Sequence, residues 1–240
     1  AINHARDDSE IIYGTTLSSL CKLGQFLSGM GHQVEGLRVT ESSVKIYHRL
    51  AADNPDAHEP NLAYALSRLG DRRWEVGQQD EAVAATSRAV MILHRLSKAD
   101  ASAHDLHLAR LLPVAGERLW EVGRRDMALR LTESSVNIYR RLAADNPNAH
   151  EPDLARSLFT WARMQVRSQQ DASEALEATG EAVEIYRRIM AAGPSALYYE
   201  PLRAVLCLQA NLLASLGRAE EAEQILSWLS VNAADSDSHK

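Results

Sequence analysis

The sequence of 240 residues has few of the residues that mark several classes of protein. Its two cysteines, Cys21 and Cys207, lie far apart in the chain, so we expect neither a disulfide framework nor a cysteine-based metal site. No apolar run approaches the ~20 residues that a membrane-spanning helix needs, and no secretory segment is present. These absences predict a cytoplasmic protein. Aromatic residues are also scarce, at 5% of the chain.

Charge and motif content narrow the function classes further. The net charge of −6 argues against general affinity for nucleic acid or an anionic membrane, because both are negatively charged themselves. The sequence contains no phosphate-cradling glycine loop, no nucleophile elbow and no paired metal-ligand motif. We therefore expect no catalytic activity, no cofactor and no bound metal.

What the sequence does contain is an internal repeat. The segment TESSVKIYHRLAADNPDAHEP, Thr40 to Pro60, returns as TESSVNIYRRLAADNPNAHEP, Thr132 to Pro152, 92 residues further on. At half that offset, 46 residues, Trp74-Glu75-Val76-Gly77 returns as Trp120-Glu121-Val122-Gly123. Agreement over so many positions predicts a repeat protein, in which each unit packs on its neighbours.

Each unit holds two helical patterns. The first, as in Leu62–Val76, carries leucines at helical spacing, and Gly77 is expected to end it in the left-handed conformation. The second runs from about Asp80 to Lys98, with acidic residues at its start and basic residues in its last turns. The pairs Asn54-Pro55 and Asn146-Pro147 are expected to break the chain before the next unit.

Counting these patterns predicts five helical hairpins, starting near residue 11. They are expected near residues 11–53, 62–99, 108–145, 154–192 and 202–231. Residues 1–10 align with the end of a preceding repeat, which suggests a fragment of a longer array, and residues 232–240 are expected to be a disordered tail. Pro113 lies inside a predicted first helix and is expected to kink it or loosen its hydrogen bonding.

Small residues recur where two helices must approach closely. One position in the first helices holds glycine, as Gly24, Gly70 and Gly116. A position near the start of the second helices holds Gly36, Ala82, Ala128, Ala175 and Ala222. A further position in the second helices holds Ser43, Ala89, Ser135 and Ala182. The succession Leu66-x-x-Leu69-Gly70, then Gly77, then Ala82 resembles the tetratricopeptide repeat.

The resemblance departs from the usual family pattern in two ways. The period is 46–49 residues rather than 34, and threonine replaces a usual aromatic at Thr40, Thr86, Thr132 and Thr179. The sequence is most similar to long-period tetratricopeptide arrays of large bacterial proteins. The resemblance implies an all-α fold, a right-handed TPR-like alpha-alpha solenoid of about five hairpins.

In the tetratricopeptide family the first helix of each pair lines the concave face. Carried over by position, that face would hold a row of Tyr64, Arg110 and Arg156, a row of Gln25, Asp71, Glu117 and Arg163, and a row of Trp74 and Trp120. These rows differ between units although the packing positions repeat, which favours a partner-binding role. Trp and Arg are typical binding hot spots. The alternative for the two tryptophans is packing between adjacent first helices.

A basic ridge recurs near the ends of the second helices, as the pairs His48-Arg49, His94-Arg95, Arg140-Arg141 and Arg187-Arg188. One interpretation is a track for an acidic peptide or a polynucleotide backbone. The other, which the acidic net charge favours, is an outer face that complements helix dipoles and neighbouring acidic residues.

Three histidines, His58, His104 and His150, are repeat-equivalent, so a solenoid would place them in a row rather than around one ion. We expect them at the surface or in loops. His107 adds a second nitrogen ligand near His104, yet no third ligand accompanies the pair.

The leading hypothesis is therefore a protein- or peptide-binding scaffold module within a larger regulatory or signalling protein. One alternative is an oligomerisation or spacer domain, since exposed repeat ends promote stacking into a homo-oligomer. A third hypothesis is a small-molecule sensor in which a kink at Pro113 opens a pocket.

Overall fold

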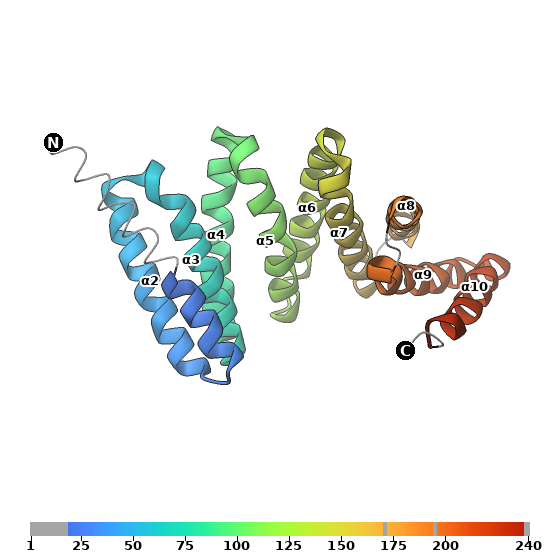
Figure 1. The fold of residues 1–240 in the computed structure, drawn as a ribbon, viewed down its shortest axis with the longest axis horizontal. Helices are drawn as coiled ribbons and strands as arrows, with labels where there is room; N and C mark the ends of the chain where they lie inside the picture. Colours follow the sequence, from blue (N-terminus) through green and yellow to red (C-terminus); the bar gives the residue numbers. More distant parts are fainter. Residues whose placement is uncertain (1–18, 170–171, 194–195, 238–240) are drawn as a thin grey trace. The chain divides into compact units, whose positions relative to one another are not determined.

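The computed structural model describes residues 19–169, 172–193 and 196–237, and every regular element in these ranges is a helix (Figure 1). A helical stretch at residues 19–29 is followed by helices α2 to α10. Their bounds are α2 Gln33–Asp53, α3 Pro55–Glu75, α4 Gln79–Ala99, α5 Ala101–Glu121, α6 Arg125–Asp145, α7 Pro147–Arg167, α8 Ala172–Ala192, α9 Ala196–Ser215 and α10 Ala219–Asp237. The all-α prediction is confirmed. The predictions for residues 1–10 and for the start near residue 11 lie outside the described residues.

The chain divides into two compact units, Ala1–Arg124 and Arg125–Lys240, and each is described by itself. In the first unit α2 packs on α3, α3 on α4 and α4 on α5. In the second unit α6 packs on α7, α7 on α8, α8 on α9 and α9 on α10. Helices therefore contact their neighbours in sequence, as in a repeat protein.

The first helices begin about two turns earlier than the sequence analysis predicted. α3 starts at Pro55, directly after Asn54, whose side chain accepts a hydrogen bond from the Ala57 N–H at 3.4 Å. α7 repeats this start, with Asn146 as its cap and Pro147 as its first residue. A proline is tolerated there because the first helical N–H groups have no partner in the helix. The first and second helices of a pair are equally long, 21 residues each in α3 and α4, so both contribute to the long period. A single residue joins each second helix to the next first helix at these two places.

Two further expectations are corrected by the helix bounds. His58, His104 and His150 lie within the opening turns of α3, α5 and α7 rather than in loops, and His58 is buried. At the other end of the chain, α10 continues to Asp237, so residues 232–237 are helical where a disordered tail was expected. α5 runs through Pro113 without a break.

The turns inside the hairpins use glycine as the sequence indicated. Gly77 has a φ of 81° and Gly123 a φ of 80°, a left-handed conformation that costs glycine little. The N–H of Gln78 then bonds the Arg73 carbonyl at 2.9 Å, which closes the end of α3. Gln169 occupies the same turn position after α7 and adopts a φ of 56° without being glycine.

The predicted small positions are buried in the helix interfaces, where Ala82, Ala128 and Ala175 have no exposed surface. The four repeated threonines are buried beside them, and each hydroxyl donates to a carbonyl of the preceding turn, as Thr86 does to Ala82 at 2.8 Å. A buried hydroxyl needs such an acceptor, since an unpaired one would destabilise the core.

The two cysteines are free and differ in surroundings. Cys207 is exposed, whereas Cys21 is buried with its sulfur 3.2 Å from the Ser43 hydroxyl. Burial raises the pKa of the Cys21 thiol above its ordinary value, and the hydrogen bond to Ser43 opposes that rise. Because the thiolate is the reactive form, Cys21 is a packing residue.

Candidate binding groove

A cavity of about 490 Å³ lies between two first helices of the first unit, α3 and α5, and we refer to it as the first-helix cavity. Residues of both helices line it, together with Leu93 of α4: Pro60, Asn61, Ala63, Tyr64, Ser67 and Arg68 of α3, and His104, His107, Arg110, Leu111 and Val114 of α5. Helical spacing of three and four residues brings each set to one side of its helix. The cavity therefore combines an apolar lining with cationic and aromatic side chains.

Tyr64 is 41% exposed in this cavity, and Arg68 lies one helical turn further along α3. The Arg68 guanidinium stacks over the Tyr64 ring at 5.5 Å from its centroid. Arg68 also pairs with Asp71, with Nη1 at 3.1 Å from Oδ2. These two contacts hold the guanidinium at the cavity wall, so that a ligand would meet a positioned cation beside an aromatic face.

Asp71 and Trp74, both predicted groove residues, belong to a network around Arg118 of α5. Arg118 is only 6% exposed, and its Nη2 donates to Asp71 Oδ1 at 2.6 Å. Its Nη1 donates to the Thr86 hydroxyl of α4, and its guanidinium lies 5.8 Å from the centroid of a Trp74 ring. Arg118 thereby ties α3, α4 and α5 together. Asp71 is already engaged inside the protein rather than offered to a partner.

Trp120 and Glu117 complete the predicted residues of the first unit. Trp120 is buried, with 7% of its surface exposed, so it presents little area to a partner. This corrects the expectation that Trp120 anchors a ligand, and its burial agrees with the packing alternative. Glu117 is exposed on α5 but does not line the cavity. The structure thus brings Tyr64 and Arg110, of the predicted set, into one cavity.

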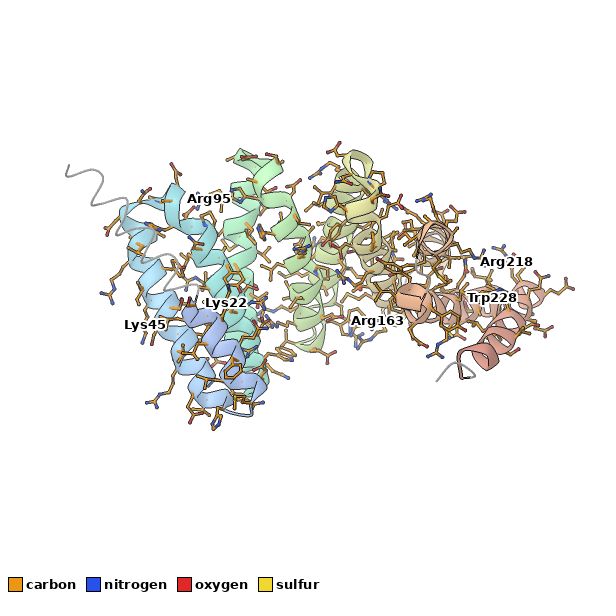
Figure 2. All side chains as sticks on the ribbon, viewed as in Figure 1. Lys22, Lys45, Arg95, Arg163, Arg218 and Trp228 are labelled. Carbon is orange, nitrogen blue, oxygen red and sulfur yellow. The ribbon has the colours of Figure 1, made fainter. Side chains whose placement is uncertain are left out.

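Arg156 and Arg163 lie on α7 in the second unit. Arg156 is exposed and forms an ion pair with Asp153, one turn earlier on the same helix. Arg163, labelled in Figure 2, is half-buried and stacks over the Phe159 ring at 5.8 Å. Both arginines are therefore held by neighbours on their own helix.

Arg68, His104 and His107 line the cavity but are not among the groove residues predicted from the sequence. The signal was present in part, because His104, His107, Leu111 and Val114 recur at three- and four-residue spacing along α5. The predicted first helix begins only near residue 108, so the histidines fall outside its helical pattern, although α5 begins at Ala101.

Three arginines of the basic ridge on the second helices form ion pairs. Arg95 pairs with Glu59, and Arg188 pairs with Glu151 at 2.7 Å between Nη2 and Oε1 (Figure 2 labels Arg95). Arg140 pairs with Glu181 at 2.6 Å between Nη2 and Oε2. These contacts agree with the interpretation of an outer face that complements neighbouring acidic residues.

The described residues also bear on membrane-spanning segments and metal sites. No helix in residues 19–169, 172–193 or 196–237 is long and apolar enough to cross a bilayer. Within that same part of the chain, no group of three His, Cys, Asp or Glu side chains is placed to hold a metal ion.

No family model and no curated protein matches this sequence, but solved structures share its fold. The kinesin-light-chain TPR-like repeats of Podosopora anserina match with a TM-score of 0.71 at 20% identity, covering 93% of this chain and 97% of that one. BtubC (BKLC) from P. vanneervenii matches with a TM-score of 0.76 at 14% identity, over 98% and 86% of the two chains. The apo form of RapI matches with a TM-score of 0.68 at 12% identity, over 93% and 72%.

The fold and these similarities define a helical repeat scaffold. The pairs of helices share the fold of TPR-like repeats, as the resemblance drawn from the sequence predicted. This chain departs from the shorter family pattern in its repeated threonines and in its helices of 21 residues, as in α3 and α4.

Proposed function

We propose that this protein binds a segment of another protein in the first-helix cavity, as a scaffold module of a larger regulatory or signalling protein. It acts by binding rather than by catalysis. The observation that carries the proposal is the convergence of Tyr64, Arg68 and Arg110 on one cavity of about 490 Å³. Aromatic and arginine side chains are the residues that most often dominate binding energy at protein interfaces.

Comparison between repeats supports this reading. Positions that pack the helices keep their residue type, as Leu62, Leu108 and Leu154 do. The cavity positions change, so that Tyr64 corresponds to Arg110 in the next unit and Arg68 corresponds to Val114. An inherited scaffold alone would repeat both kinds of position.

The lining also indicates the chemistry of the segment. Arg68 and Arg110 favour an acidic side chain, because a guanidinium binds a carboxylate with two parallel hydrogen bonds. Leu93, Leu111 and Val114 favour an apolar side chain next to it. The expected ligand is a short extended or helical segment that carries both.

Replacing Tyr64 and Arg110 by alanine together is expected to reduce partner capture at least about tenfold, since both are exposed side chains that line the cavity, one on each of its two first helices. The measurement is quantitative affinity capture from a native lysate of the source organism, followed by mass spectrometry. Folding should be unchanged, because both side chains are exposed.

A matched control removes a similar pair outside the cavity. Arg88 and Met91 of α4 are both exposed, and neither lines the first-helix cavity. The Arg88→Ala, Met91→Ala variant should capture the same proteins as the unchanged chain. Equal capture by the cavity variant and this control would refute the groove as the binding surface.

A second candidate function, self-association, is favoured by a separate observation. The hairpin of residues 19–53 exposes four large apolar side chains, Leu23, Phe26, Met30 and Val34, with Phe26 63% exposed. Such clusters mark contact sites. Sedimentation equilibrium of the full chain would then show a concentration-dependent dimer that Phe26→Ser with Met30→Ser converts to monomer. A monomer at all concentrations would exclude this function.

A further inference from the structure

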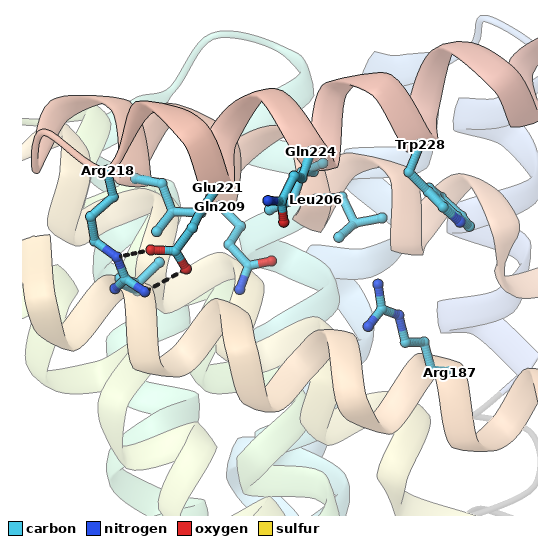
Figure 3. A pocket seen from close by; sticks show the side chains of 10 residues that line it. Arg187, Leu206, Gln209, Arg218, Glu221, Gln224 and Trp228 are labelled. Carbon is cyan, nitrogen blue, oxygen red and sulfur yellow. Dashed lines mark hydrogen bonds and ion pairs between the residues drawn. The ribbon is translucent and has the colours of Figure 1, made fainter.

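A second cavity, of about 380 Å³, lies in the second unit, and we call it the last-hairpin pocket. It is lined by α8, α9 and α10 and is distinct from the first-helix cavity in residues and in helices (Figure 3). Arg187 of α8 points toward α10, and Trp228 of α10 points back toward α8. Leu206 and Gln209 of α9 also line the pocket.

The repeat supplies a template for what Arg187 binds. Arg187 lies in Ile185-Tyr186-Arg187-Arg188, which corresponds to Ile138-Tyr139-Arg140-Arg141 one unit earlier. Arg140 holds the Glu181 carboxylate with two donors, Nε at 3.3 Å from Oε1 and Nη2 at 2.6 Å from Oε2. A bidentate pair of this kind is the preferred geometry between a guanidinium and a carboxylate.

The carboxylate of this template is missing at the next step of the repeat. Ala175 of α8 and Ala222 of α10 occupy equivalent positions of the repeat. Counting forward equally from each of them shows that Trp228 of α10 is the equivalent of Glu181 of α8. Arg187 therefore faces an indole where Arg140 faces a carboxylate. Within residues 19–169, 172–193 and 196–237, no acidic side chain pairs with Arg187, although its neighbour Arg188 pairs with Glu151 at 2.7 Å.

The other residues that line the pocket are also suited to binding a ligand from solution. Glu221, the acidic residue of the pocket, is held by Arg218 through two hydrogen bonds of 2.6 and 2.7 Å. Gln209 and Gln224 add amide groups that can donate or accept. Trp228 is 38% exposed and gives the pocket a broad apolar wall.

We propose that the last-hairpin pocket binds a carboxylate that carries an adjoining apolar group. Arg187 takes the carboxylate as Arg140 takes Glu181, and the Trp228 indole covers the apolar group. An acidic peptide side chain and a small organic acid both have this chemistry. The site is independent of the first-helix cavity and of the function proposed for it.

The test uses the ¹⁵N-labelled full chain and two probes, 3-phenylpropionate and the blocked dipeptide N-acetyl-Leu-Glu-amide. The chain has four tryptophans, so the Trp228 indole N–H signal can be assigned from the spectrum of Trp228→Phe. We expect a saturable shift of that signal with at least one probe. The neutral analogue 3-phenylpropanamide should not produce it. Tighter binding of the dipeptide would identify a peptide ligand, and tighter binding of phenylpropionate a small acid.

Substituting each of the two repeat-equivalent arginines distinguishes binding at this pocket from a general effect of removing a positive charge. Arg187→Gln is expected to weaken probe binding at least about tenfold, because a charge-assisted hydrogen-bonded pair is lost. Arg140→Gln should leave it unchanged, since that guanidinium is already occupied by Glu181. Both side chains lie at the surface, so neither change should unfold the chain.

A third variant supplies the missing carboxylate from the chain itself. Trp228→Glu places beside Arg187 the same residue type that Arg140 contacts. With Arg187 still present, this variant should no longer bind the probes, which is measured from the NMR signals of the probes themselves. No shift with either acid would overturn the proposal. So would equal affinity of the Arg187→Gln and Arg140→Gln variants, or equal binding of the neutral amide.

Discussion

Replacing Arg118 by alanine is expected to lower the free energy of unfolding of the first unit by about 3 kcal/mol. The change removes three contacts together: the hydrogen bond donated to Thr86, the ion pair with Asp71 and the stacking on Trp74. Loss of one partner of a buried pair typically costs about 3–5 kcal/mol. The lower end applies because Asp71 is 19% exposed and keeps its second partner, Arg68.

The second unit provides the matched replacement for this position. Met164 corresponds to Arg118 one repeat later, and its sulfur lies 3.7 Å from the Thr132 hydroxyl. Arg118→Met should therefore recover about half of the loss or more, because it refills the space without a charge. Arg110→Ala, on the exposed side of α5, should change stability by less than about 0.5 kcal/mol. Urea unfolding followed by circular dichroism measures all three, and an Arg118→Ala variant as stable as Arg110→Ala would contradict the network.

The repeat made the fold predictable because the packing positions survive in every unit. Ala82, Gly70 and Leu66 have equivalents throughout the chain, and their burial follows from helical spacing. The predicted helix starts are wrong, because the pairs Asn54-Pro55 and Asn146-Pro147 indicate a break in the chain. Pro55 instead opens α3, and Pro60 lies in the second turn of the same helix.

The site was less predictable, since its residues are the ones that do not repeat. Position alone placed Tyr64 and Arg110 on the cavity side of their helices. The place of a residue in the repeat does not show that Asp71 pairs with Arg118, because these two residues lie on different helices and 47 residues apart in sequence. Nor could it show that Trp120 is buried while Trp74 is only half-buried, since the same residue type stands at equivalent places. Such differences arise from neighbours in space.

Gly36→Ala is expected to destabilise the first hairpin by about 2 kcal/mol, against the trend of the repeat. The equivalent residues of the other hairpins are Ala82, Ala128, Ala175 and Ala222, so the repeat pattern alone would favour alanine. In this hairpin, however, a Cβ at Gly36 would lie 2.6 Å from the Gly24 carbonyl oxygen and 3.3 Å from the Ser28 nitrogen. Both are backbone atoms, so the helices must separate to admit it.

The control is a glycine whose environment has room. A Cβ at Gly180, inside α8, would meet only the Gln209 amide nitrogen at 3.8 Å, an ordinary contact. Gly180→Ala should therefore stabilise the protein by about 0.5–1 kcal/mol, the difference in helix propensity. Urea midpoints that move in opposite directions for the two variants would show that backbone contact sets the spacing of the first hairpin. If both variants are stabilised, residues 19–29 and α2 can separate at little cost, and the helix propensity of alanine outweighs the contact between Gly24 and Gly36.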